Sequence, residues 1–412
     1  MFVRYIRGPK SKRRSRLRVG ALAAYIDSFV SLLCQRGYTH VTRRAQMGVF
    51  ADLGRWLERS HVGLKDLDEK HVEAFFQARW QRVSDRRGKG TIKALLQHLR
   101  QSNVIPTAKP APPNDIDFVE QEYRAFLTGE RALTQGSVEQ YLRIARRFVS
   151  HWFKGGSVRL HKLRAKNVTE FVLADMPQRS RSAAQCTTKV LRSFLGYLFQ
   201  QGRTTTNLAV AVPTVPGWRL SQLPRFLEGR QVEKVLRCCD RRTKMGKRDY
   251  AVLVLLARLG LRAGEVAKLA LDDIDWQAGE LLVRGKGTRI DKLPLLQDVG
   301  QVLVEYLQKA RPESSSRSVF LRSRAPFVGF PGAGAISWIA RSALARAQVY
   351  LHHRAAHVFR HSLATQMLGN GASLAQIGQV LRHQHVSSTE IYAKVDLNPL
   401  RRLALPWPGG VL

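Results

Sequence analysis

The segment His357-Val358-Phe359-Arg360-His361 is followed by a helical pattern, then by Leu381-Arg382-His383, and nine residues after His383 by Tyr392. Imidazole, guanidinium and phenol groups are therefore concentrated in one short region near the C-terminal end. A phenol can act as a covalent nucleophile when neighbouring groups neutralise the charge of the electrophile that it attacks. Because the neighbours here are cationic or imidazole groups, the pattern predicts a phosphate ester as the electrophile.

Two upstream segments extend this pattern. Leu261-Arg262-Ala263-Gly264-Glu265 adds a guanidinium, and Gly285-Lys286-Gly287 adds an amine at a glycine-rich turn. In this order the segments resemble the boxes of the tyrosine recombinases, the phage-integrase family of DNA strand-exchange enzymes. The resemblance covers roughly residues 225–400. It rests on the ordered set, because each segment alone would be a weak signal.

The resemblance implies a catalytic role for each matched residue. The implied set is Arg262, Lys286, His357, Arg360, His383 and Tyr392. Tyr392 would attack the phosphodiester, while the two arginines would hold its oxygens in a fork and stay charged. The resemblance implies neither a metal ion nor another cofactor, because a side chain protonates the leaving group and the arginines supply the electrostatic stabilisation.

The other implied roles concern protons and orientation. His383 would donate a further hydrogen bond to the phosphate, and His357 would act as an acid or base near the nucleophile. Lys286, at the tip of a β-hairpin, would protonate the departing 5′ oxygen. Glu265 would hold neighbouring groups in place, and a plain surface carboxylate is the alternative interpretation of this residue.

Arg382 departs from the family pattern, which has glycine immediately before the third-box histidine. Glycine suits a helix end at which φ is positive, and arginine adopts that geometry at a cost of ~1 kcal/mol. Arg382 therefore either adopts a positive φ or ends the helix differently. This difference affects the direction in which the His383 side chain points. From the sequence we expect Arg382→Gly to leave DNA cleavage unchanged or modestly faster.

The histidine spacing also raises the possibility of zinc. His353, His357 and His361 are spaced to share one helical face. However, Val358 occupies the position at which a His-Glu-x-x-His metalloprotease box has glutamate. We therefore predict no metal site.

The charge balance predicts a polyanionic partner. The chain has 412 residues, with 68 Lys and Arg against 31 Asp and Glu, for a formal net charge of +37. Double-stranded DNA is the predicted partner, bound with a steep dependence on salt. A basic ribosomal or disordered protein is the alternative, but 44% hydrophobic residues and seven Trp favour folded cores.

Individual DNA-binding residues are predicted from charge and position. They are Lys93 and Lys189 and, in the basic arm, Arg4, Arg7, Arg13 and Arg14. A solvated tail without function is the alternative for the arm, because blocks of like charge are often simply disordered.

Other features predict the cellular compartment. Four cysteines form neither a disulfide framework nor a CxxC pair, which fits a reducing bacterial cytoplasm and, for an enzyme that acts on DNA, the nucleoid. No apolar run reaches the length of ~18 residues that a membrane span needs.

A pattern of apolar residues recurs at a fixed offset of 96 residues. Corresponding positions include Trp56 and Trp152, Phe75 and Phe171, Leu95 and Leu191, and Lys93 and Lys189. The recurrence predicts the same helical unit twice, although two unrelated bundles could share part of it by chance. By resemblance, the second copy is the core-binding domain that precedes the catalytic domain in tyrosine recombinases.

The predicted fold is mainly α-helical with a small antiparallel β-sheet. Two tandem helical, SAM-like DNA-binding domains precede an α+β tyrosine-recombinase catalytic domain, with proline-rich segments at the boundaries. The predicted parts are a basic arm 1–18, a helical domain 19–108, a core-binding domain 115–205, a linker 206–224, a catalytic domain 225–396 and a tail 397–412. Residues 279–295 should form a β-hairpin around the Gly-Lys-Gly turn.

These features together predict a site-specific DNA recombinase or integrase of a phage or mobile element. It would cut and rejoin strands through a 3′-phosphotyrosyl intermediate, as a homotetramer assembled on DNA, alone or with related recombinases. A type IB topoisomerase shares the chemistry and is one alternative. A catalytically impaired DNA-binding accessory factor is another, and Arg382 is the feature in its favour.

Overall fold

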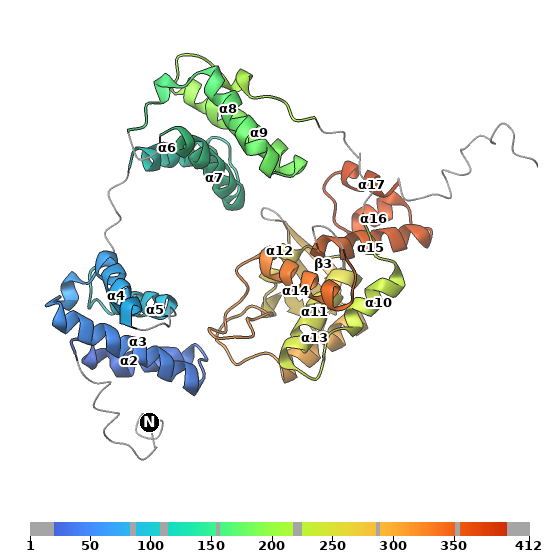
Figure 1. Ribbon diagram of the computed structural model, residues 1–412. Coiled ribbons are helices and arrows are strands. Elements are labelled where there is room, and N and C mark those ends of the chain that lie inside the picture. The colour runs from blue at the N-terminus through green and yellow to red at the C-terminus, as the bar shows by residue number, and fades with distance from the viewer. Residues whose placement is uncertain are drawn as a thin grey trace, which may run out of the picture. The chain divides into compact units, whose positions relative to one another are not determined.

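The computed structural model describes residues 20–82, 88–107, 114–153, 157–216, 225–285, 289–350 and 355–393. Figure 1 colours the chain by residue number. Within the described residues, successive stretches of the chain bury separate hydrophobic cores. The fold is mainly helical with a small sheet, as predicted from the sequence.

The first stretch is a helical bundle. Its helices are α2 (Ile26–Gln35), α3 (His40–Arg59), α4 (Glu69–Arg82) and α5 (Lys89–Gln101). The Thr39 side chain caps α3 by accepting a hydrogen bond from the backbone N–H of Thr42 at 3.3 Å. Phe29, Leu53 and Leu95 are fully buried in the core, because apolar residues at helical spacing place one face of each helix inward.

The second stretch is also a helical bundle, and residues 109–222 form a compact unit of their own. Its helices are α6 (Asp115–Gly129), α7 (Gln135–Trp152), α8 (Ala165–Asp175) and α9 (Arg181–Gln200). Asn114 and Asp117 cap α6 reciprocally, each side chain accepting the other's backbone N–H. Tyr123 is buried in the core and donates its hydroxyl to Ser193 at 3.1 Å.

The two bundles repeat several elements at the offset of 96 residues. The 3-10 turns are Leu64–Asp66 and Leu160–Lys162, and α4 and α8 begin at corresponding positions. Corresponding apolar residues are buried in both, namely Leu53 and Val149, Phe75 and Phe171, and Leu95 and Leu191. Apolar residues at these matching positions are therefore buried in both bundles, and the duplication itself stays a prediction.

The second bundle extends beyond its predicted end at residue 205. Leu208 and Val212 are buried in its core, with a 3-10 turn at Leu208–Ala211 between α9 and the following prolines. These residues fall inside the predicted linker 206–224. Short apolar turns carry no helical period, so the sequence pattern did not reveal that they pack on the bundle.

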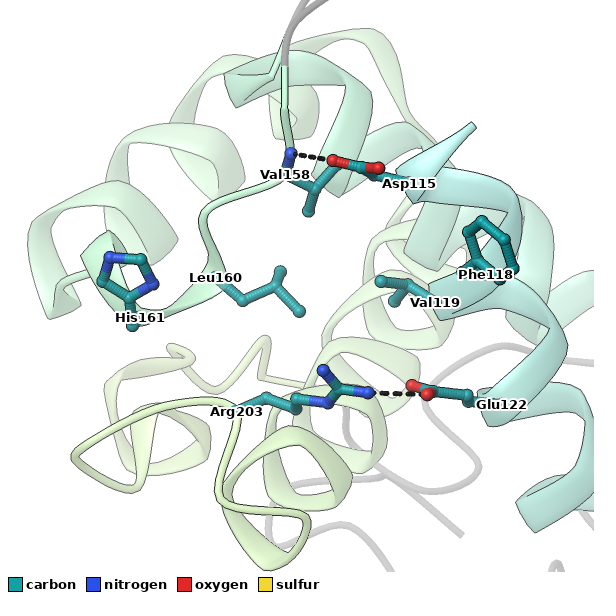
Figure 2. Close-up of a pocket in the computed structure, with 8 residues that line it drawn as sticks. All are labelled: Asp115, Phe118, Val119, Glu122, Val158, Leu160, His161 and Arg203. Atoms are coloured by element: carbon teal, nitrogen blue, oxygen red, sulfur yellow. Dashed lines mark hydrogen bonds and ion pairs between the residues drawn. The ribbon is translucent and has the colours of Figure 1, made fainter. Parts of the chain in front are cut away.

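A pocket of about 270 Å³ opens in the second bundle (Figure 2). Val119 and Leu160 point toward each other inside it. Four of its lining residues are paired with one another, because Arg203 donates to Glu122 at 2.6 Å and the backbone N–H of Val158 donates to Asp115 at 2.9 Å. The residues around the pocket therefore connect α6 to the segments before α8 and after α9.

The third stretch is the α+β body. Its elements are α10 (Gly229–Arg237), α11 (Lys244–Arg258), α12 (Ala263–Lys268), β1 (Ile274–Asp275), β2 (Glu280–Arg284), β3 (Ile290–Pro294), α13 (Gln297–Lys309), α14 (Ala333–Arg346), α15 (Ala355–Gly369), α16 (Leu374–Val380) and α17 (Glu390–Ala393). Helix α11 is its central helix, with every residue from Ala251 to Leu256 buried.

The small sheet has the strand order β1-β2-β3, and all its pairings are antiparallel. Leu281 lies opposite Leu293 across the predicted hairpin. Leu281 and Val283 are buried in the core, while the alternating residues Glu280, Leu282 and Arg284 are less buried, as expected for a sheet with one covered face. Strand β1 was not predicted, because two residues are too few to show an alternating pattern.

The C-terminal helices α15, α16 and α17 form a small satellite core at one end of this body. Ala364, Ile377, Leu381 and Tyr392 are its buried members. None of the helices in the described part of the chain has the length and apolar composition needed to cross a membrane.

Candidate active site

Arg360 joins three segments that lie far apart in the sequence. Its side chain projects from α15 into the protein and is 1% exposed. One guanidinium nitrogen donates to the carbonyl of Gly260 at 2.5 Å, and the other donates to the carbonyl of Leu381. Gly260 follows α11 with a φ of 57°, and Leu381 caps the C-terminal end of α16, where a cation is favourable. Arg360 therefore holds the ends of α11 and α16 together.

Arg262 and Glu265 form the next part of the site. Arg262 is the N-cap of α12, and its backbone N–H donates to Glu265 at 2.8 Å. The Arg262 guanidinium donates to the other carboxylate oxygen, also at 2.8 Å. Glu265 is buried while the Arg262 side chain is 42% exposed, so the carboxylate holds a guanidinium that solvent can reach. The plain surface-carboxylate alternative for Glu265 is wrong.

The environment of Glu265 favours its ionised, carboxylate form. Burial alone would raise the pKa of this carboxyl group. The hydrogen bond from the Arg262 backbone and the positive charge of Arg382 outweigh burial, so the pKa is lowered. Glu265 is therefore a carboxylate at neutral pH.

Tyr392 lies in α17 and is 2% exposed. Its hydroxyl oxygen is 2.9 Å from Nδ1 of His361, and the hydroxyl donates this hydrogen bond when Nδ1 carries no proton. Burial raises the pKa of Tyr392 to about 12, although the charges of Arg360 and Arg262 act in the opposite direction. The phenol is therefore protonated at neutral pH, and removal of its proton has to accompany any attack.

His383 stacks beside Tyr392, with the two rings nearly parallel at 4° and their centroids 6.4 Å apart. Its Nδ1 is 2.7 Å from the hydroxyl of buried Thr389. Burial lowers the pKa of His383 to about 4, and the charges of Arg360 and Arg262 lower it further. His383 is therefore neutral at neutral pH. If Thr389 donates to Nδ1, the ring proton is on Nε2, free to point at a ligand.

His357, predicted to act as an acid or base near the nucleophile, lies beside His361 on α15, and that role stays a prediction. Its ring lies 4.7 Å from that of His361, one turn along the same helix, in an edge-on arrangement. His361 is within hydrogen-bond distance of the phenol, and the charge of His357 helps to lower the pKa of His383. Sequence analysis predicts no catalytic role for His361.

Arg382 has a positive φ of 55°, the first of the two alternatives that its position left open. Its backbone N–H donates to Gln379, and the next N–H, that of His383, donates to Gly378, each at 2.9 Å. This pair of bonds is a Schellman motif, the usual way to end a helix with one left-handed residue. The helix therefore ends as it would with glycine, and His383 leaves it in the corresponding direction.

Several predicted site residues lie outside the described parts of the chain. They are Lys286, Arg4, Arg7, Arg13 and Arg14, together with His353 of the weighed zinc cluster. Lys93 and Lys189 are described and exposed, on α5 and α9 respectively. Among the residues that the structure describes, no group of His, Cys, Asp and Glu side chains is arranged to hold a metal ion.

The amino-acid sequence of this chain is similar to those of known proteins. Residues 225–398 match the model of the phage integrase family. The chain is 42% identical over 394 residues to the integrase/recombinase y4rA of Sinorhizobium fredii, with 95% of each chain covered. This chain belongs to the phage integrase family of tyrosine recombinases. It is accordingly a site-specific recombinase, the class of enzyme that cuts and rejoins DNA strands.

Other relatives of this recombinase agree with that assignment. Tyrosine recombinase XerD of Listeria monocytogenes is 30% identical over 285 residues, which cover 68% of this chain and 94% of XerD. The solved structure of XerH recombinase bound to its difH substrate has a TM-score of 0.53 at 18% identity, covering 69% of this chain and 83% of that one. At that identity the structural likeness shows the fold alone.

The low pKa of His383 leads to a direct test by NMR. In the DNA-free recombinase, the His383 ring signals should titrate with a midpoint near pH 4, because burial and the nearby arginines disfavour the charged imidazole. The His383 signals are assigned by their loss in His383→Gln. A midpoint near the ordinary value of ~6.5 would show that the ring is not enclosed by these cations.

Proposed function

We propose that Tyr392 attacks a phosphodiester of double-stranded DNA and forms a 3′-phosphotyrosyl intermediate. The main support is the environment of this phenol, which lies between His361 and His383 and within the fields of Arg262 and Arg360. A buried phenol with a raised pKa is a poor nucleophile unless its proton is accepted and the charge of the phosphate is neutralised. This site has a group for each task.

In the proposed cleavage step, one phosphate ester bond replaces another. The phenol oxygen bonds to phosphorus while the bond from phosphorus to the 5′ oxygen breaks. The phenol proton passes to Nδ1 of His361, 2.9 Å away. Lys286, beyond the described residues, would return a proton to the 5′ oxygen. Rejoining reverses these steps with a 5′ hydroxyl, so the ester conserves the bond energy and the reaction needs no ATP.

The phosphate charge would be met by fixed donors. Burial lowers the pKa of Arg360 to about 9, with the charges of Arg262 and Arg382 adding to the effect, so Arg360 still carries its charge at neutral pH. Its anchoring to backbone carbonyls fixes the position of this charge. Neutral His383 can donate a hydrogen bond without requiring protonation. Preorganised donors of this kind typically contribute ~3–4 kcal/mol each to transition-state stabilisation.

The same chemistry could belong to other functions. In a type IB topoisomerase one protein opens and reseals one strand, but the match to XerD includes the segment ahead of the catalytic body and favours strand exchange. In a catalytically impaired accessory factor we would expect a lost nucleophile or arginine, yet Arg262, Arg360, His383 and Tyr392 are all present and gathered in one site.

Strand exchange between two duplexes requires a nucleophile on each of four strands, so we propose a homotetramer assembled on DNA, alone or with related recombinases. A solved lambda integrase tetramer bound to a Holliday junction shares the fold, with a TM-score of 0.53 at 14% identity over 75% of this chain and 87% of that one. The likeness to an integrase/recombinase along 95% of the chain supports a mobile element or phage as its origin. Its place in the cell would then be the nucleoid.

Replacement of the nucleophile tests the proposed chemistry. Tyr392→Phe should bind DNA normally and form no covalent complex with a nicked suicide duplex drawn from the flanks of its own gene, because only the attacking oxygen is lost. Tyr250→Phe, a tyrosine of the same body packed against Arg241, is the matched control and should still trap DNA. Trapping by Tyr392→Phe would mean that another residue is the nucleophile.

The role of the first bundle calls for a separate proposal. We propose that it binds DNA next to the core site, since it resembles the second bundle position by position, exposes Lys93 as that bundle exposes Lys189, and follows the basic arm. Docking to protein is the alternative, because residues 52–73 carry several carboxylates.

Deletion of residues 1–112 distinguishes these roles. It should shorten the nuclease footprint on one side of the core site and flatten the salt dependence of binding, because fewer counterions are released. Covalent complexes on short suicide duplexes should remain measurable. An unchanged footprint and salt slope, with loss of tetramers, would assign the first bundle to protein docking instead.

A further inference from the structure

Arg382 combines two unfavourable features. It is a non-glycine residue with a φ of 55°, which costs ~1 kcal/mol relative to glycine. Its guanidinium is also buried, with the side chain only 4% exposed, and burying an unpaired charge costs several kcal/mol. Both costs fall on the residue that immediately precedes His383. Some interaction made by the side chain must offset them.

The side chain of Arg382 makes that interaction with Glu265. One guanidinium nitrogen donates to Oε2 of Glu265 at 2.9 Å. The same oxygen accepts the backbone N–H of Arg262, and Oε1 accepts the Arg262 guanidinium. A single buried carboxylate is therefore shared by two arginines, one at the end of α16 and one at the start of α12.

Arg382 also reaches the β-hairpin. Its Nε is 3.8 Å from a carboxylate oxygen of Asp291 in β3, and Asp291 lies opposite Val283 across the hairpin. Asp291 follows Lys286 by five residues along the same hairpin. The cation thus lies among three segments that each carry a predicted site residue, namely α12, the hairpin and the end of α16.

We propose that Arg382 is a positioning residue of this recombinase. Its guanidinium fixes the Glu265 carboxylate, and that carboxylate in turn holds the guanidinium of Arg262 toward the DNA phosphate. The guanidinium of Arg382 is paired with carboxylates of the protein, so it does not itself touch the substrate. This inference rests on the proposed cleavage by Tyr392, and it reverses the expectation from sequence that glycine at this position would be neutral or beneficial.

Single-turnover cleavage of a suicide duplex tests the inference. Arg382→Gly should lower the cleavage rate about tenfold to a hundredfold, the range expected when an oriented group is misplaced by an ångström or less. DNA affinity and its salt dependence should be unchanged, because the charge of Arg382 is already paired with Glu265. Arg382→Lys should recover part of the rate, since it keeps the charge but loses the fork. Equal rates for wild type and a folded Arg382→Gly would overturn the inference.

Gln348→Gly is the matched control. Gln348 has a φ of 56° at the end of α14, where the bonds from its own N–H to Ala345 and from Val349 to Leu344 form the same motif, and its side chain is exposed. Glycine there relieves the same backbone strain without removing an ion pair. Its cleavage rate should match wild type. A rate loss equal to that of Arg382→Gly would assign the effect to the helix end rather than to the guanidinium.

A double mutant separates coupling from general damage. In a Glu265→Gln background, Arg382→Gly should cost much less than it does in wild type, because the carboxylate through which Arg382 acts is already gone. The full loss in both backgrounds would overturn the coupling. A loss of affinity with a flatter salt dependence would instead mean that Arg382 contacts DNA. Failure of wild type itself to cleave would count against the proposed function, not against this inference.

Discussion

The site depends on one buried guanidinium bound by two backbone carbonyls. Arg360 donates to Gly260 at the end of α11 and to Leu381 at the end of α16, and these segments carry Arg262 and His383 immediately afterwards. The two carbonyl oxygens replace hydrogen bonds that the guanidinium would make with water, which reduces the cost of burying its charge. Both the arginine ahead of α12 and the histidine after α16 take their positions from this contact. Gly260 fits here because a Cβ would lie 2.8 Å from the Leu381 side chain.

Burial, acting with or against the concentration of positive charge, sets the protonation states of His383 and Tyr392. The arginines and burial together lower the pKa of His383, so that histidine can donate a hydrogen bond without carrying charge. The same arginines act to lower the pKa of Tyr392, although burial outweighs them in the DNA-free protein. A bound phosphate would bring the negative charge that this cluster lacks. Glu265 is the carboxylate that keeps the cluster stable before DNA arrives.

Much of this arrangement could be predicted from the sequence, because the decisive residues occur in ordered short segments. The helical fold and the hairpin followed from periodicity, while the rules for helix ends left a positive φ at Arg382 as one of two alternatives. The partner of Tyr392 did not follow, since His357 and His361 share one helical face and only the packing of α17 decides which ring meets the phenol. The Arg382–Glu265 ion pair could not be predicted from the sequence either, because 117 residues separate its two members.

The central claim is that these segments form one cleavage site with Tyr392 as its nucleophile. The most direct measurement is mass spectrometry of the recombinase trapped on a nicked suicide duplex, after digestion of both protein and DNA. The account predicts a single modified peptide containing Tyr392, with the nucleotide attached through its 3′ phosphate. A nucleotide on any other residue, or attachment through a 5′ phosphate, would contradict it.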